Sequence, residues 1–104
     1  MNKTLAEFKR EICVGKKIKQ IERYQRDASG SLVAVPVPEK IAGQRVVTYK
    51  DTTGFYLNYE GKPGRGSFLA YPKASELVFI INVFTITDRD ANGEQWLKMV
   101  YLID

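Results

Sequence analysis

The first apolar pattern in the chain has a helical period. Its positions i, i+3 and i+7 are occupied by Leu5, Phe8 and Ile12. Thr4 and Glu7 have the spacing of a capping box, in which each side chain accepts a hydrogen bond from the other residue's backbone amide. Gly15 can supply the left-handed residue that ends many helices. The pattern predicts a helix over residues 5–13 with one apolar face.

The next segment, residues 16–26, fits two structures. Ile18, Ile21 and Tyr24 are spaced by three, which suits a helix. The segment also follows a glycine and contains β-forming residues. A strand with a bulge near residues 19–20 would place Ile18 and Ile21 on one face. We favour the strand and keep the helix as the alternative.

Residues 27–43 have the composition of a connection. Turn-forming residues fill positions 27–31. Pro36 and Pro38 each lack a backbone N–H, so the segment around them is at most an edge strand or an extended polyproline stretch.

Strand patterns dominate the rest of the chain. Residues 45–50 and 55–59 flank a four-residue loop, which is a hairpin signal. Further strand patterns cover residues 67–71, 77–81, 84–87 and 95–103. In the last of these, the alternate positions Leu97, Met99, Tyr101 and Ile103 share one face.

Together these elements predict one domain, residues 1–104, of the α+β class and mainly β. We expect an N-terminal helix packed on a small five- or six-stranded antiparallel barrel-like sheet, built from a β meander over about residues 44–103. The expected core contains Leu5, Phe8, Ile12, Val47, Leu57, Leu69, Phe79, Ile86, Leu97 and Met99.

Basic residues are concentrated in the first quarter of the chain. Residues 1–26 contain eight Lys/Arg and three acids, a net charge of +5, whereas residues 27–104 contain eight and nine, a net charge of −1. The chain has no histidine and one cysteine. It therefore has no Cys–His or Ser–His pair, and it carries no cofactor fingerprint. We expect a non-enzymatic binding protein without a cofactor or a metal.

The lengths of the apolar stretches indicate a cellular location. The N-terminus has no apolar region of the kind found in signal peptides, and residues 77–84 are too few to span a bilayer. We expect a cytoplasmic protein with no membrane partner. Cys13 lies beside the apolar stripe of the predicted helix, so we expect a partly buried structural residue.

The basic segment is the leading candidate for a binding site. Its cations can neutralise phosphates, and its tyrosine can stack on a base. The candidate residues are Lys9, Arg10, Lys16, Lys17, Lys19, Arg23, Tyr24 and Arg26. The same residues could form a solvated face or bind an acidic protein surface. The alternative function is therefore a protein–protein interaction module, such as an inhibitor of a host defence nuclease, without direct nucleic-acid contact.

Two glycine-containing segments resemble ligand loops. Residues 88–93 match the first half of a calcium loop, but Met99 stands where the closing Glu belongs. Asn92 and Gly93 between two strand patterns indicate a hairpin turn instead. Residues 61–67 are rich in glycine but lack the Gly-Lys-Ser/Thr of a phosphate loop, so we expect a flexible hairpin loop there.

Aromatic residues gather on three consecutive predicted strands. They are Tyr49, Phe55, Tyr56, Tyr59, Phe68 and Tyr71. On an open sheet face such residues stack on bases, but each strand must also bury one face. The two interpretations are a nucleic-acid platform and half of a hydrophobic core.

Segments 5–10 (LAEFKR), 14–18 (VGKKI) and 71–77 (YPKASEL) resemble short proteins of bacteria, phages and mobile elements that have no assigned activity. The resemblance implies an accessory protein of a phage or mobile element, and it assigns no site residues.

Overall fold

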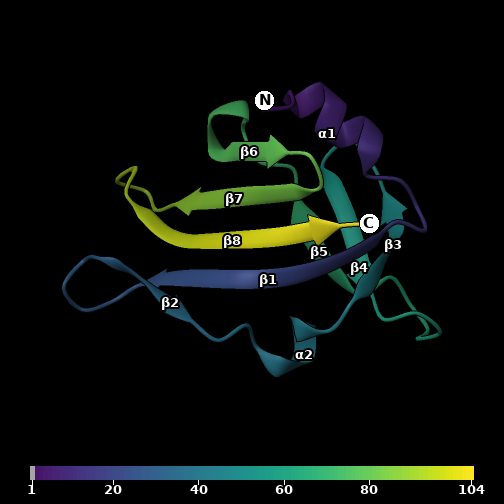
Figure 1. The fold of residues 1–104 in the computed structure, drawn as a ribbon, viewed down its shortest axis with the longest axis horizontal. Coiled ribbons are helices and arrows are strands. Elements are labelled where there is room, and N and C mark those ends of the chain that lie inside the picture. Colours follow the sequence, from purple (N-terminus) through teal and green to yellow (C-terminus); the bar gives the residue numbers. More distant parts are fainter. Residues whose placement is uncertain (1) are drawn as a thin grey trace.

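The computed structural model describes residues 2–104, and they form one bent antiparallel sheet with a short helix at one end (Figure 1). The strands are β1 (Lys17–Arg26), β2 (Leu32–Val35), β3 (Arg45–Lys50), β4 (Gly54–Asn58), β5 (Ser67–Ala70), β6 (Leu77–Ile80), β7 (Val83–Arg89) and β8 (Gln95–Ile103). The helical elements are α1 (Leu5–Glu11), α2 (Glu39–Ala42) and a 3-10 turn, η1 (Ala74–Glu76). The fold is mainly β with a short N-terminal helix, as the sequence predicts.

The sheet has the strand order β5-β4-β3-β1-β8-β7-β6, and β2 pairs with the C-terminal half of β1. β1 pairs with β8 along most of its length, but with β3 only through Lys17 and Ile18. At this junction the sheet bends, so that β3, β4 and β5 cross the direction of the other long strands (Figure 1).

The predicted five- or six-stranded barrel-like sheet is wrong in strand number and in closure. The sheet has eight strands and is open, because the end strands β5 and β6 do not pair with each other. The outer edge of β6 bonds to the N-terminal segment instead, where the Lys3 amide donates to the Phe79 carbonyl at 2.7 Å. A strand edge that is already paired cannot close a barrel.

α1 covers one end of the bent sheet. Its capping box forms as predicted: the Glu7 amide donates to Thr4 Oγ1 at 3.1 Å, and the Thr4 amide donates to Glu7 Oε1 at 3.2 Å. The helix ends at Glu11, earlier than predicted, because Ile12 is already extended. Gly15 does have a positive φ of 95°, but it lies in the turn that leads into β1.

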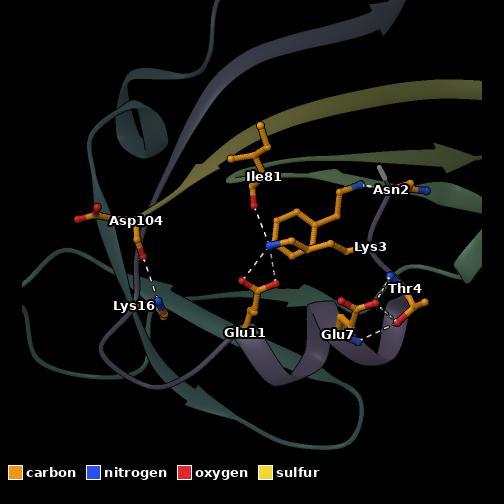
Figure 2. Close-up of polar contacts among 9 residues, drawn as sticks. Asn2, Lys3, Thr4, Glu7, Glu11, Lys16, Ile81 and Asp104 are labelled. Carbon is orange, nitrogen blue, oxygen red and sulfur yellow. Dashed lines mark hydrogen bonds and ion pairs between the residues drawn. The ribbon is translucent and has the colours of Figure 1, made fainter.

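The Lys3 ammonium ties α1 to the turn between β6 and β7 (Figure 2). Lys3 Nζ lies 3.0 Å from Glu11 Oε2 and 2.9 Å from the carbonyl oxygen of Ile81, and it sits 4.5 Å from the centre of the Phe79 ring. Ile81 has a φ of 57°, which is unusual for a β-branched residue. This contact helps to fix the tip of the β6–β7 hairpin beside the helix.

The core is formed by one buried cluster between α1 and the concave face of the sheet. Phe8 is fully buried, and its ring centre lies 4.8 Å from that of Phe84 and 5.5 Å from that of Phe79. Of the predicted core, Leu5 and Leu69 are only partly buried against the cluster, and the others are buried.

Residues 16–26 form a strand rather than a helix, but the bulge differs from the prediction. The register of β1 against β8 shifts between Gln20 and Glu22, so Ile21 is the extra residue and is 41% exposed. The prediction that Ile18 and Ile21 share a face is therefore wrong. Ile18 and Gln20 point into the core, and after the bulge Arg23 takes the inward position opposite Met99.

The predicted connection over residues 27–43 contains two short elements. β2 is an edge strand paired with β1, and it ends at Val35 before the prolines, which cannot donate to a ladder. α2 begins after Pro38 and lies near β1.

Candidate nucleic-acid interface

The outer face of β3, β4 and β5 carries a row of three aromatic side chains. Tyr49, Tyr56 and Phe68 occupy paired positions on the three strands. The ring centres of Tyr49 and Tyr56 are 5.9 Å apart, and those of Tyr56 and Phe68 are 5.1 Å apart. Tyr49 is 36% exposed and Phe68 is 46% exposed. We call these three residues the aromatic ladder.

Strand alternation and one bulge produce the ladder. Phe55 and Leu57 point inward and are buried, so Tyr56 between them must point outward. On β3 the register shifts between Val47 and Tyr49, so Thr48 is the extra residue and Tyr49 faces outward opposite Tyr56. The six predicted aromatics therefore divide between the ladder and positions that serve packing.

The three aromatics outside the ladder have structural roles. Phe55 is fully buried, and Tyr71 packs against the cluster with its ring centre 5.8 Å from that of Phe55. The Tyr59 hydroxyl donates to the Lys40 carbonyl at 2.9 Å and accepts from the Gly43 amide at 3.3 Å. Tyr59 thus anchors α2 to β4.

Arg65 lies against the aromatic ladder. Its guanidinium carbon is 3.7 Å from the centre of the Tyr49 ring and 5.7 Å from that of Tyr56. The Thr48 hydroxyl donates to the Arg65 carbonyl oxygen at 2.6 Å, which holds the loop backbone on the sheet. A cation stacked on aromatic rings beside exposed ring faces can contact both a phosphate and a base.

The loop that carries Arg65 connects β4 to β5, which pair as the hairpin that the sequence predicts. Its glycines Gly61, Gly64 and Gly66 all have positive φ. A Cβ at Gly66 would come within 2.1 Å of the Leu57 carbonyl oxygen, so the chain needs glycine there. Asn58 Nδ2 donates to the carbonyl oxygens of two loop residues, and these bonds connect the loop to the end of β4.

The structure brings three of the predicted basic residues together at the start of β1. Lys16, Lys17 and Lys19 are exposed. Lys17 and Lys19 line a groove of about 350 Å³ beside Leu102. Lys16 Nζ donates to the main-chain oxygen of Asp104 at 3.2 Å (Figure 2). Lys17 also pairs with Val46, so it belongs to the outer face in the row beside the ladder.

Lys9 and Arg10 lie on α1 and are exposed. Lys9 Nζ sits 5.1 Å from the centre of the Tyr71 ring. The carbonyl oxygen of Lys9 accepts a hydrogen bond from Lys50 Nζ at 2.7 Å, which adds a third cation near the end of the helix.

Arg23, Tyr24 and Arg26 do not join this basic group. Arg26 pairs with Asp90 at 2.8 Å and with Glu94 at 3.3 Å, which neutralises its charge. The Tyr24 hydroxyl donates to the Glu22 carboxylate, and this bond raises the pKa of Tyr24. Arg23 points to the concave side, as described above.

The turn between β7 and β8 is the hairpin that Asn92 and Gly93 predict. Gly93 has a φ of 79°, and its amide donates to the Asp90 carbonyl at 3.0 Å. Asp90 Oδ1 accepts from the amides of Asn92 and Glu94, and Oδ2 accepts from Arg26. The pKa of Asp90 is lowered by the Arg26 hydrogen bond and then by these amides. The carboxylate therefore closes the turn.

The burial of two residues, Cys13 and Arg45, was not predicted correctly from the sequence. Cys13 is exposed rather than partly buried, because the helix ends before it; its Sγ lies 3.1 Å from the Arg10 carbonyl oxygen. Arg45 is only 5% exposed, and we did not single it out from the sequence. Its alternation with the apolar Val47 was the available signal that it faces inward.

No helix within residues 2–104 is long and apolar enough to cross a membrane. No protein-family model, curated protein or solved structure matches this chain.

Proposed function

We propose that this protein binds single-stranded nucleic acid on the outer face of β3, β4 and β5, in a binding role rather than a catalytic one. The observation that carries the proposal is the exposed aromatic ladder with the Arg65 guanidinium stacked on Tyr49 at 3.7 Å. Proteins that bind single strands combine aromatic stacking surfaces with cations that follow the phosphates.

Single strands suit this face better than a duplex. Bases in a single strand can leave their stack and lie on a ring, whereas bases in a duplex present only their edges. α1 has seven residues, about two turns, which is short for a helix that reads base edges in a major groove.

The basic residues extend the proposed site beyond the ladder. Lys17 lies on the same outer face of the sheet as the ladder. Lys16 and Lys19 lie close to Lys17 in the sequence and are also exposed. Lys9 and Arg10 are exposed on α1 and add positive charge. These cations would contact phosphates with little dependence on base sequence. Arg26 contributes nothing in this account because acidic side chains already pair with it.

Fluorescence anisotropy with a labelled oligothymidylate of about ten nucleotides tests the proposal. Phe68→Ala should weaken binding by about 5- to 150-fold, since stacking contributes about 1–3 kcal/mol per base. Phe68→Trp should retain binding, because it retains a ring. Trp96→Ala is the matched control, since Trp96 is a 39% exposed aromatic on β8. Equal losses in the Phe68 and Trp96 variants would refute a site on the ladder.

A specific observation also favours the alternative function, a protein-binding module. Exposed apolar side chains lie on β6, in the turn after it and on β8: Val78 is 48% exposed, Ile80 43%, Ile81 77% and Leu102 38%. Ile80 and Leu102 both pair with Val83, so they lie in one row across the sheet. Grouped apolar exposure of this kind marks many protein interfaces. Capture of partners from a lysate, with and without nuclease, separates the two candidate functions. If the protein-binding function is correct, a protein partner remains bound after nuclease treatment. Ile80→Asn should abolish the binding of that partner, whereas Phe68→Ala should not.

A further inference from the structure

The concave side of the sheet contains a buried arginine without a counter-charge. Arg45 is the first residue of β3 and is 5% exposed. None of the four ion pairs among residues 2–104 includes it, and its buried Nε makes no hydrogen bond. Burial lowers the pKa of the Arg45 guanidinium, which reflects the cost of keeping this charge away from water.

A second arginine approaches the same region. After the β1 bulge, Arg23 points inward, and its Nη1 donates to Gln20 Oε1 at 3.3 Å. Its Nε is also buried without a partner. Gln20, the partner of Arg23, lines one cavity together with Arg45 and Tyr101, so both guanidinium groups approach the same region. Burial raises the pKa of the Tyr101 phenol, and the positive charges of Arg45 and then Arg23 oppose that rise. Two cations therefore converge where no ion pair balances them.

Arg45 lines a cavity of about 200 Å³ that also contains Gln20, Ser67 and Tyr101. Gln20 Nε2 lies 3.4 Å from the Tyr101 hydroxyl, which in turn donates to the Met99 sulfur at 3.3 Å. A polar donor set thus surrounds part of the cavity.

The rest of the cavity wall is apolar. It consists of Ile41, Leu57, Phe68, Leu69 and Met99. The volume is below the range of about 300–1,000 Å³ that holds drug-sized molecules, so the ligand must be small. An apolar wall beside a guanidinium matches a ligand with one anionic group and an apolar body.

We propose that this cavity binds a small organic monocarboxylate, whose carboxylate pairs with Arg45 and whose apolar body contacts Leu57, Leu69 and Met99. The planar guanidinium fork matches the two oxygens of a carboxylate. Gln20 and the Ser67 hydroxyl supply further donors. The carboxylate provides the missing counter-charge for the buried cation. Phe68 of the aromatic ladder also lines this cavity, so the site adjoins the proposed nucleic-acid face. The proposal does not rest on nucleic-acid binding, because its anchoring residue, Arg45, is buried and is not part of the ladder.

Benzoate is the first probe, with benzamide as its uncharged analogue and inorganic phosphate as an anion without an apolar body. Binding is followed by NMR titration of the methyl groups of Ile41, Leu57, Leu69 and Met99 in the wild-type protein. We expect saturable benzoate shifts in these methyl groups, and at least tenfold weaker binding of benzamide and of phosphate. Benzoate shifts that occur only elsewhere, or equal binding of phosphate, would overturn the proposal.

Two variants complete the test. Arg45→Met should weaken benzoate binding at least tenfold, whereas Arg89→Met removes an exposed arginine on β7, outside the cavity, and should leave benzoate binding unchanged. If Arg45→Met does not fold, Arg45→Lys keeps the charge without the fork and should still bind benzoate more weakly than wild type. Unchanged affinity in a folded Arg45 variant would contradict the proposal.

Discussion

The Arg65 guanidinium carbon lies 3.7 Å from the centre of the Tyr49 ring. Tyr49 is on β3, whereas Arg65 is in the loop between β4 and β5. The contact joins a positive charge to the end of the aromatic ladder. Arg65→Ala should therefore weaken single-strand binding by about tenfold, since it removes a cation–π partner and a phosphate contact. Arg65→Lys should recover part of the loss, because it restores charge without a planar stacking group. Arg89→Ala, on β7, is the control in the same anisotropy assay, and an equal loss there would contradict the role of Arg65.

Salt should weaken nucleic-acid binding in a way that reports the phosphate contacts. Three to five contacts predict a log–log slope of about −2 to −3.5, at about −0.7 per contact on a single strand. Replacing Lys16, Lys17 and Lys19 with Glu should make the slope shallower and reduce affinity at low salt. Lys40→Glu on α2 is the control for a single charge reversal outside the proposed interface, and it should not change the slope. A slope that does not change in the triple variant would exclude these lysines from the interface.

Phe8→Ala should lower the free energy of unfolding by about 3–5 kcal/mol. Phe8 is fully buried and its ring contacts aromatic rings from three parts of the chain, so its removal leaves a cavity under α1. Urea denaturation followed by circular dichroism measures the loss. An unfolding midpoint close to that of the wild type would contradict the packing of α1 on the sheet.

Ile81→Asn should stabilise the protein by about 1 kcal/mol. Ile81 has a φ of 57° and is 77% exposed, so the wild type carries the left-handed strain of a β-branched residue without a packing gain. Asparagine tolerates this conformation, and the Ile81 carbonyl that binds Lys3 is retained. The neighbouring Ile80→Asn changes a residue with ordinary backbone geometry and should give no increase in thermal unfolding temperature. A similar increase in both variants would show that replacing an exposed apolar side chain, and not the relief of backbone strain, is responsible.

Arg45→Met should leave the free energy of unfolding unchanged or raise it by about 1 kcal/mol. The buried guanidinium has no ion pair to lose, and an apolar chain of similar length avoids the cost of burying charge. Thermal unfolding without benzoate gives the measurement. A large destabilisation would assign Arg45 a structural role in the wild type.

Acid should weaken the loop between β3 and β4. The Thr53 hydroxyl and amide hydrogen bonds, joined by the Gly54 amide, lower the pKa of the Asp51 carboxyl in the folded protein. Because the folded-state pKa lies below the unfolded value of about 4, this stabilisation is present above pH 4 and is lost as the pH falls through the folded-state pKa. Asp51→Asn should therefore show a smaller loss of stability than the wild type between about pH 4 and pH 2. Equal pH dependence in urea unfolding would contradict this assignment.

Local sequence patterns correctly predicted the structural features that depend only on neighbouring residues. The Thr4–Glu7 capping box and the alternation in β8 appear as predicted. The bulges at Ile21 and Thr48 were not correctly predicted, because a bulge depends on the partner strand's register rather than on the residue itself. The two bulges determine which side chains of β1 and β3 face outward. For this reason the sequence did not show that Arg23 leaves the basic group, nor that Tyr49 joins the aromatic ladder. The bend between β1 and β3 likewise depends on long-range pairing.

The most direct test of the nucleic-acid account is NMR shift mapping with an oligothymidylate of about ten nucleotides at low salt. We expect the largest shifts at Tyr49, Tyr56, Phe68 and Arg65, with smaller shifts at Lys17. No shifts at low salt, or shifts confined to the Val78, Ile80 and Leu102 surface, would contradict it.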